Sequence, residues 1–181
     1  IYNVDPDIST FGKAMANGFS VACVAGKKKI MELGSITNKK EERVFLLSTT
    51  HGAEMSSLGA FIKTVEFLKK NNTIQKNWNY GYDLTTATNQ IAKDMKINDY
   101  FYMSGPSCSP IFNCKDKNFE NSMKFRTLFI QEMLKSKVFM PWIAICHRHG
   151  KKELNLTIQA IEKTLAIYKK ALNGNVKRFI Q

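Results

Sequence analysis

The 181-residue sequence has no long hydrophobic run and only four cysteines. No apolar stretch approaches the roughly 20 residues that a membrane-spanning helix needs, and no secretory signal is visible. The cysteines (Cys23, Cys108, Cys114 and Cys146) are irregularly spaced and form no C-x-x-C pair. This spacing argues against a disulfide scaffold or a zinc ribbon and fits a reducing cytosol. We therefore expect a cytoplasmic protein without a membrane partner.

Acidic residues are also scarce, since 15 Asp and Glu face 27 Lys and Arg, which gives a net charge of +12. The basic residues are scattered along the chain in short clusters such as Lys27 to Lys29. No long basic block and no nucleic-acid-binding motif accompanies them. We interpret most of them as solvated surface and expect no nucleic-acid partner, although a basic nucleic-acid-binding domain stays open as an alternative function.

What the sequence does have is a globular composition, with 44% hydrophobic and 11% aromatic residues. Short apolar runs predict a buried strand over 20–26 and further strands over 43–47, 99–105 and 110–114. Helical patterns follow over 27–33, 58–68, 74–96 and 119–137, with Gly81 weakening the third. The order of the elements predicts an α/β beginning followed by an α+β tail, with a boundary between residues 70 and 80.

The final helix carries the clearest pattern. Its apolar positions follow steps of four and three residues: Leu154, Ile158, Ile161, Leu165, Tyr168 and Leu172. This stripe predicts one face buried in a core, while Lys151, Lys152, Lys163 and Lys169 stay in water. Asn173-Gly174 closes the helix.

The segment DISTFGKAMANG, residues 7–18, places Lys13 among small residues in what we interpret as a turn. An ε-amine is a nucleophile only when it is neutral, and its ordinary pKa is about 10.4. Burial and a nearby cation lower that pKa, and the amine can then condense with an aldehyde. By spacing alone, Lys13 could equally be one more solvated surface lysine.

The segment PDISTFGKAMANGF, followed by SVACVAGKKKIMEL, resembles the region around the cofactor lysine in class III (subgroup II) pyridoxal-phosphate aminotransferases. Within this family it is most similar to the glutamate-1-semialdehyde 2,1-aminomutases and related aminotransferases. LLSTTHGAEMSSLGA resembles the family's threonine-containing turn, and FRTLFIQEMLKSKVFMP resembles its small-domain helix. The resemblance covers nearly the whole chain.

The resemblance implies the C-terminal part of a fold type I transferase, with residues 1–72 ending the large cofactor domain and 73–181 forming a small α+β domain. It implies pyridoxal 5'-phosphate as the cofactor, Lys13 as the catalytic Schiff-base lysine and Thr49 as a ligand of the cofactor phosphate, reaching across a homodimer whose subunits share the active site. The partners it implies are a small-molecule amino donor and acceptor. From the residues alone, Ser48, Thr49 and Thr50 could equally cap a helix.

Other chemistry-bearing residues are weaker candidates. Cys146, His147 and His149 could ligate a metal, but no second ligand pair lies at a useful spacing, so we predict no metal site. Arg148 could meet a substrate carboxylate, and Arg126 by default lies on a solvated helix face. Trp78, Tyr80 and Tyr82 are interpreted as an aromatic seam packed on the core rather than a base-stacking platform.

The family pattern is incomplete in this sequence. The aspartate that pairs with the pyridine nitrogen, the phosphate loop and the ring-stacking residue would all precede Lys13, and we expect the chain to be a C-terminal fragment that is inactive alone. The aminomutases' Asn-Pro after the threonine turn is replaced by Ala53-Glu54, which leaves aminomutase and aminotransferase both open. A catalytically inactive dimer partner is a further alternative.

Overall fold

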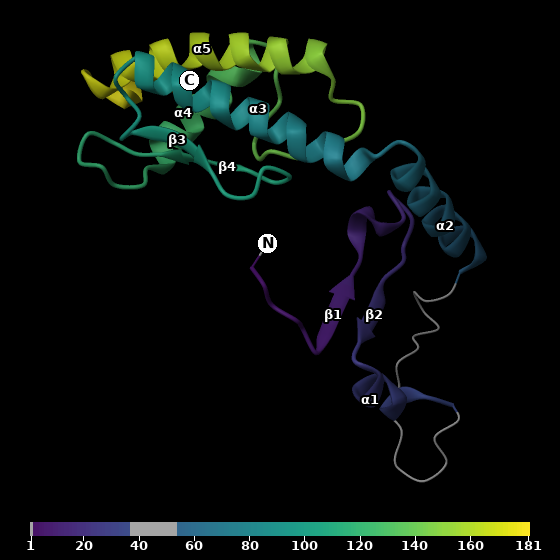
Figure 1. The fold of residues 1–181 in the computed structure, drawn as a ribbon. Coiled ribbons are helices and arrows are strands. Elements are labelled where there is room, and N and C mark those ends of the chain that lie inside the picture. The colour runs from purple at the N-terminus through teal and green to yellow at the C-terminus, as the bar shows by residue number, and fades with distance from the viewer. Residues whose placement is uncertain (1, 37–53) are drawn as a thin grey trace. The chain divides into compact units, whose positions relative to one another are not determined.

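The computed structural model describes residues 2–36 and 54–181 and divides the chain into two compact units, Ile1–Asn71 (unit 1) and Asn72–Gln181 (unit 2). Unit 1 contains, in chain order, β1 (Ile8–Phe11), the 3-10 helix η1 (Lys13–Met15), β2 (Cys23–Gly26), α1 (Lys28–Met31), η2 (Glu32–Gly34) and α2 (Met55–Lys70) (Figure 1). Unit 2 contains α3 (Thr73–Asp94), β3 (Phe101–Ser104), β4 (Ile111–Cys114), α4 (Met123–Lys135), α5 (Lys151–Leu172) and η3 (Val176–Arg178). None of the described helices is long and apolar enough to cross a membrane.

Unit 1 is built around an antiparallel hairpin of β1 and β2, in which Ile8 lies opposite Gly26 and Phe11 lies opposite Cys23. The interpretation of residues 7–18 as a turn missed β1. The predicted strand over 20–26 is present but starts at Cys23, and its residues are exposed or half-buried rather than buried. The short helix predicted over 27–33 is confirmed as α1 and η2.

The described part of unit 1 holds few buried residues, since only Ala16 and Ser57 are less than 9% exposed. Large apolar side chains are solvent-exposed instead, namely Tyr2, Val4, Ile8, Phe11, Phe19, Val24, Leu33, Ile36, Met55, Ile62 and Phe67. The helix predicted over 58–68 is confirmed as α2, but its apolar stripe is at most half-buried. The described elements of unit 1 therefore contribute little core of their own.

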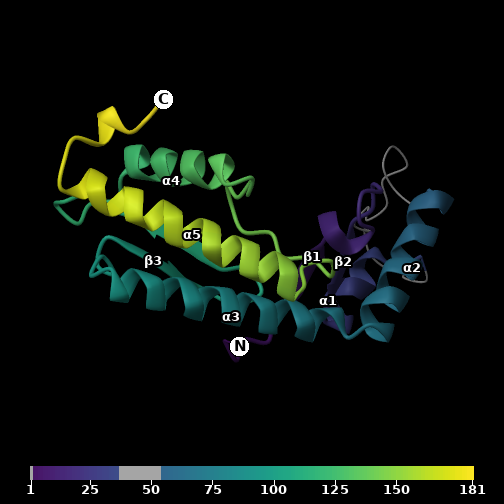
Figure 2. The same ribbon diagram turned by 90° about the horizontal axis from the view of Figure 1, so that it is seen from above.

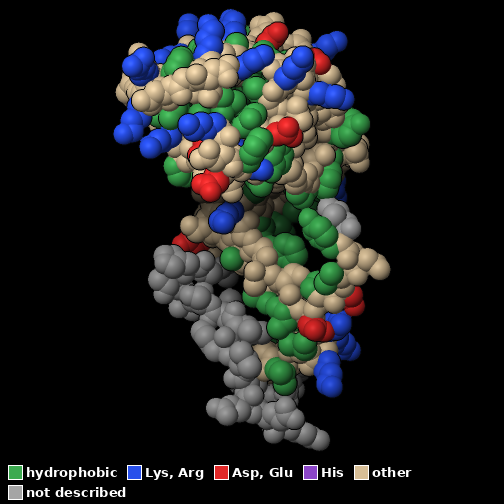
Figure 3. All heavy atoms as spheres, turned by 90° about the vertical axis from the view of Figure 1, so that its left-hand side faces the viewer, with side chains coloured by type: hydrophobic (Ala, Val, Ile, Leu, Met, Phe, Trp, Pro, Cys, Tyr) green, Lys and Arg blue, Asp and Glu red, His purple; other side chains and the backbone are tan. Residues whose placement is uncertain are grey.

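Unit 2 is a layer of three helices packed on the antiparallel pair β3 and β4, which a turn at Gly105 connects. Helix α5 contacts both α3 and α4 and lies between them (Figure 2). The sheet contacts the same two flanking helices, β3 through α3 and β4 through α4. Lysine and arginine side chains are spread over the face of unit 2 that Figure 3 shows, as expected for solvated charge.

The core of unit 2 is centred on aromatic side chains from the sheet and the helices. The ring of Phe101 lies 4.8 Å from that of Phe129 and meets Tyr168 edge-on at 5.8 Å. All three side chains are fully buried, as are Leu128, Met133, Ile161 and Leu165. Aromatic pairs in such geometries contribute stability beyond their buried area.

Helix α5 confirms its predicted pattern. Ile161, Leu165 and Tyr168 are fully buried, whereas Lys151, Lys152, Lys163 and Lys169 are exposed. Its first turn is capped by Glu153, which accepts the backbone N–H of Gly150 at 2.9 Å. This hydrogen bond holds the pKa of the Glu153 carboxyl below its ordinary value.

The buried hydroxyl of Tyr168 ties α5 to the sheet. It lies 2.6 Å from the carbonyl oxygen of Lys115 and 3.2 Å from that of Tyr100. The Tyr100 carbonyl also accepts the Lys115 N–H, so removing the hydroxyl deprives mainly the Lys115 carbonyl of a partner. We expect Tyr168→Phe to lower the free energy of unfolding by about 1–2 kcal/mol, measured by urea unfolding. Tyr82→Phe, at an exposed ring, is the control and should leave the midpoint unchanged; equal effects of both changes would contradict this role.

Candidate functional site

Lys13 lies in the connection between β1 and β2, immediately after the strand ends at Phe11. Gly12 is extended, with φ −170°, and Lys13 then adopts a left-handed backbone conformation, with φ +51°. Such a conformation is uncommon for a residue with a side chain and persists only where the surroundings impose it. The Lys13 side chain is exposed in the described structure, so its amine is accessible to a reactant.

The turn around Lys13 is tight and built from small residues. The N–H of Met15 donates to the carbonyl of Gly12 at 3.1 Å, which closes η1 around Lys13. Asn17 and Gly18 also have positive φ values, +50° and +112°. Repeated left-handed residues fold the connection back toward β2 within a few residues.

The base of the hairpin is fixed by Asp7 and Lys27. The Lys27 ammonium lies 2.8 Å from the Asp7 carboxylate, and the Lys27 backbone N–H donates to the Asp7 carbonyl at 2.9 Å. A Cβ on the neighbouring Gly26 would lie 2.5 Å from that same carbonyl oxygen, so the close strand approach requires glycine there. The hairpin that carries Lys13 is thus pinned at the end opposite the lysine.

The other predicted parts of this site fall outside the described residues. These are the strand expected over 43–47 and the predicted cofactor-phosphate ligand Thr49. The structure therefore places Lys13 but does not bring it together with Thr49. The roles of both residues stay predictions.

The segment 146–149 of unit 2 makes hydrogen bonds within that unit. His147 Nδ1 lies 3.1 Å from the Thr73 hydroxyl, and the Cys146 N–H donates to His149 Nδ1 at 3.3 Å. The His149 ring also lies tilted against the Tyr80 ring, with 5.4 Å between the ring centres. In the part of the chain that the structure describes, no group of three or more His, Cys, Asp or Glu side chains could hold a metal ion.

Arg126 differs from its prediction as a solvated residue. Its Nη2 donates to the carbonyl of Pro141 at 2.8 Å, and its guanidinium lies 4.5 Å from the centre of the Phe112 ring. It thereby fixes the segment that follows α4. Sequence periodicity did not indicate these two contacts of Arg126, because Pro141 and Phe112 lie in other segments of the chain.

The predicted aromatic seam is present only in part, since Trp78 and Tyr80 are half-buried but Tyr82 is 62% exposed.

The cysteines of unit 2 should differ sharply in reactivity. Burial raises the pKa of the Cys114 thiol to about 12, whereas Cys146 is exposed. Since the thiolate is the nucleophile, we expect iodoacetamide to modify Cys146 rapidly and Cys114 only after unfolding. Peptide mass spectrometry with and without urea measures this, with Cys146→Ser as the control. Equal labelling of both sites in the native protein would contradict the burial of Cys114.

The fold is that of pyridoxal-phosphate transaminases. A solved structure described as a transaminase with PLP bound superimposes on 95% of this chain with a TM-score of 0.76, at 15% sequence identity, and the match covers 41% of that chain. The described residues mix helices and strands, and their strands form two antiparallel pairs. The predicted fold class, the C-terminal part of a fold type I transferase, is confirmed.

Sequence comparison gives the family. The class-III aminotransferase family matches residues 1–100, a range that includes both Lys13 and Thr49. The chain is 30% identical over 175 residues to a 3-aminobutyryl-CoA aminotransferase of Cloacimonas acidaminovorans, covering 95% of this chain and 40% of the relative. It is also 30% identical over 177 residues to a glutamate-1-semialdehyde 2,1-aminomutase of Nitrosopumilus maritimus, covering 91% and 40%. The chain belongs to the class-III aminotransferases and spans about 40% of the length of these relatives.

Proposed function

We propose that the protein of which this chain is a part catalyses pyridoxal-phosphate-dependent amino-group transfer, with Lys13 as the residue that binds the cofactor aldehyde. The observation that carries the proposal is the left-handed backbone of Lys13 in a tight hairpin connection, within the range that matches the class-III family. Strained backbone conformations of this kind are common at functional sites. The accessible amine and the small neighbours Gly12 and Ala14 fit the approach of a flat ring.

In this proposal the cofactor, when bound, would supply an electron sink for the electrons that a substrate releases with its proton. Lys13 has two tasks. Its amine would hold the cofactor aldehyde, and after displacement by the substrate amine the same Nζ would accept and return the transferred proton. The short helical turn and the ion pair at the base of the hairpin fix the backbone that carries Lys13.

Thr49 is proposed as a ligand of the cofactor phosphate from the second subunit of a homodimer. A hydroxyl and the free N–H groups of a helix start suit a phosphate dianion. The substrates are a small-molecule amino donor and an acceptor; in an aminomutase the acceptor is the neighbouring carbon of the same molecule. Relatives with each activity are similar to this chain, so both reactions remain within the proposal.

The test uses the full-length protein and pyridoxal phosphate. Wild type should develop the visible absorbance of a cofactor joined to a lysine, and Lys13→Ala should lack it. Lys29→Ala, which removes an exposed lysine of α1, is the matched control and should keep the band. A band of normal intensity in Lys13→Ala would overturn the role of Lys13, and salt-sensitive binding to oligonucleotides without a band would favour the nucleic-acid alternative.

A further inference from the structure

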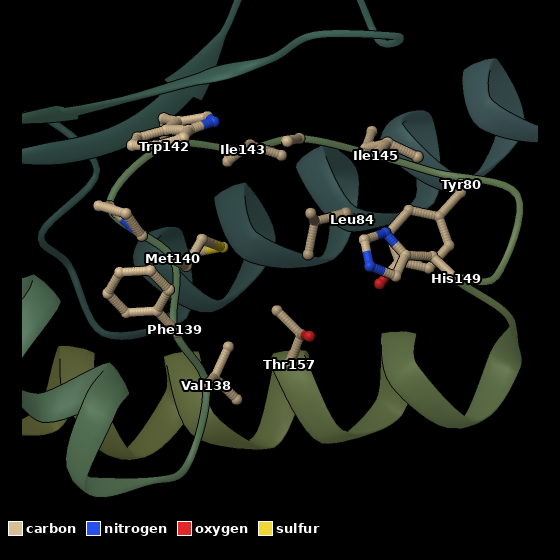
Figure 4. Close-up of a pocket in the computed structure, with 12 residues that line it drawn as sticks. Tyr80, Leu84, Val138, Phe139, Met140, Trp142, Ile143, Ile145, His149 and Thr157 are labelled. Atoms are coloured by element: carbon tan, nitrogen blue, oxygen red, sulfur yellow. The ribbon is translucent and has the colours of Figure 1, made fainter. Parts of the chain in front are cut away.

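Unit 2 contains a cleft of about 290 Å³ between α3, α5 and the segment that joins α4 to α5 (Figure 4). The segment passes over Leu84, with Phe139 and Trp142 at one end of the cleft and Tyr80 and His149 at the other. Most of the lining is apolar. Its buried part includes Leu84, Met140 and Ile143, which are 2%, 6% and 9% exposed.

Polar groups line the other end, and they are held by their own hydrogen bonds. The Thr157 hydroxyl donates to the Glu153 carbonyl at 2.8 Å. The His149 ring is oriented by the Cys146 N–H, which donates to Nδ1. In the neutral ring the proton is then on Nε2, so His149 offers one N–H donor at the polar end of the cleft.

The open end carries the largest exposed apolar side chains of this region. Phe139 is 75% exposed and Trp142 is 68% exposed, although both border an apolar cleft that they could fill. The hydrogen bond from Arg126 to the carbonyl of Pro141, between them in the chain, holds the backbone away from such a collapse. An open cleft with exposed aromatic walls and a few fixed polar groups is typical of a small-molecule site.

We propose that this cleft binds a small uncharged aromatic molecule of one or two rings that carries one hydrogen-bond acceptor. An apolar cavity of about 150 Å³ is known to hold benzene, so about twice that volume admits a second ring. The rings would pack on Leu84 and Ile143 between the two exposed aromatic side chains, and the acceptor would face the Nε2–H of His149. Neither the cofactor nor the role of Lys13 enters this inference.

Quinoline, a two-ring aromatic with one acceptor nitrogen, is the probe. Added to the full chain with labelled methyl groups, it should shift the Leu84 and Ile143 methyl resonances saturably, with a Kd of about 1 mM or tighter. Thr157→Phe, which fills the cleft from α5, should abolish the shifts. Leu156→Phe places the same ring on the adjacent, exposed position and should preserve them. Shifts that do not saturate, or that persist in Thr157→Phe, would overturn the site.

A second pair of measurements tests the site even if the Thr157→Phe variant fails to fold. Indene is a two-ring hydrocarbon without an acceptor, and wild type should bind quinoline more tightly than indene. In His149→Phe the ratio of the two affinities should fall about three- to tenfold, as loss of one hydrogen bond predicts. The ratio cancels any effect of the substitution on the shape of the cleft, so an unchanged ratio would overturn the acceptor assignment.

Discussion

Replacing Lys13 with alanine is expected to lower the amino-transfer rate of the full-length protein by at least about 10³-fold. Under the proposed function, the substitution removes both the amine that would hold the cofactor aldehyde and the group that would carry the proton. The Cβ of alanine is tolerated poorly at φ +51°, as is that of lysine, so the local backbone conformation changes little. The expected loss is therefore chemical rather than structural.

The experiment measures single-turnover amino transfer with saturating pyridoxal phosphate, with Lys29→Ala as the control. Added methylamine should restore part of the Lys13→Ala rate, because a free amine can replace the missing proton carrier. A structural role for Lys13 would not respond to the amine. A rate within tenfold of wild type in Lys13→Ala would contradict the mechanism.

The second large effect is expected at Gly81, in the middle of α3. A Cβ at this position would lie 1.7 Å from the carbonyl oxygen of Ser107 and 2.7 Å from Cδ1 of Ile145. The Ser107 backbone cannot yield as a flexible side chain would, so either the helix or the loop must move. We expect Gly81→Ala to lower the free energy of unfolding by about 3 kcal/mol, despite the better helix propensity of alanine.

Tryptophan fluorescence during urea unfolding measures this effect, because Trp78 and Trp142 both lie in unit 2. Gly59→Ala is the matched control, since Gly59 also lies within a helix but a Cβ there would meet nothing within 4 Å. The control should leave the fluorescence midpoint of unit 2 unchanged. A Gly81→Ala protein that is as stable as wild type would contradict the close packing of α3 against the 105–109 loop.

Gly81 also illustrates what the sequence could and could not predict. The periodicity over 74–96 predicted α3 within two residues at each end, and the glycine appeared as a weakness of that helix. Its actual role, the close passage of Ser107, depends on a contact between segments 26 residues apart in the chain. Helical periodicity reports which face is buried but not what packs on it.

The strands predicted over 99–105 and 110–114 are present as β3 and β4, whereas β1 was harder to predict than the helices. The stripe of α5, from Leu154 to Leu172, predicted its buried face because one helix contains the whole pattern. Strand β1 was missed because ISTF has no clear alternation, and its stability depends on pairing with β2. The residues of β2 and the apolar stripe of α2 are more exposed than predicted. An apolar pattern indicates a face that can be buried, but it does not identify the residues that would cover that face.

The candidate site was predictable where a local motif carries it. The resemblance of PDISTFGK predicted the family, which the class-III match confirms, and it singled out Lys13, whose role stays a prediction. The cleft beside Tyr80 and His149 was not predicted, because three separate segments form its walls. Its only sequence signal was the aromatic residues of α3, which we interpreted as core packing.

The most direct test of the central claim is to locate the residue that bonds the cofactor. The full-length protein is loaded with pyridoxal phosphate, reduced with borohydride to fix the carbon–nitrogen bond, digested and mapped by mass spectrometry. The added cofactor mass is expected on the peptide that contains Lys13, and no added mass is expected in Lys13→Ala. Cofactor mass on a different lysine, with Lys13 unmodified, would contradict the proposed role of Lys13.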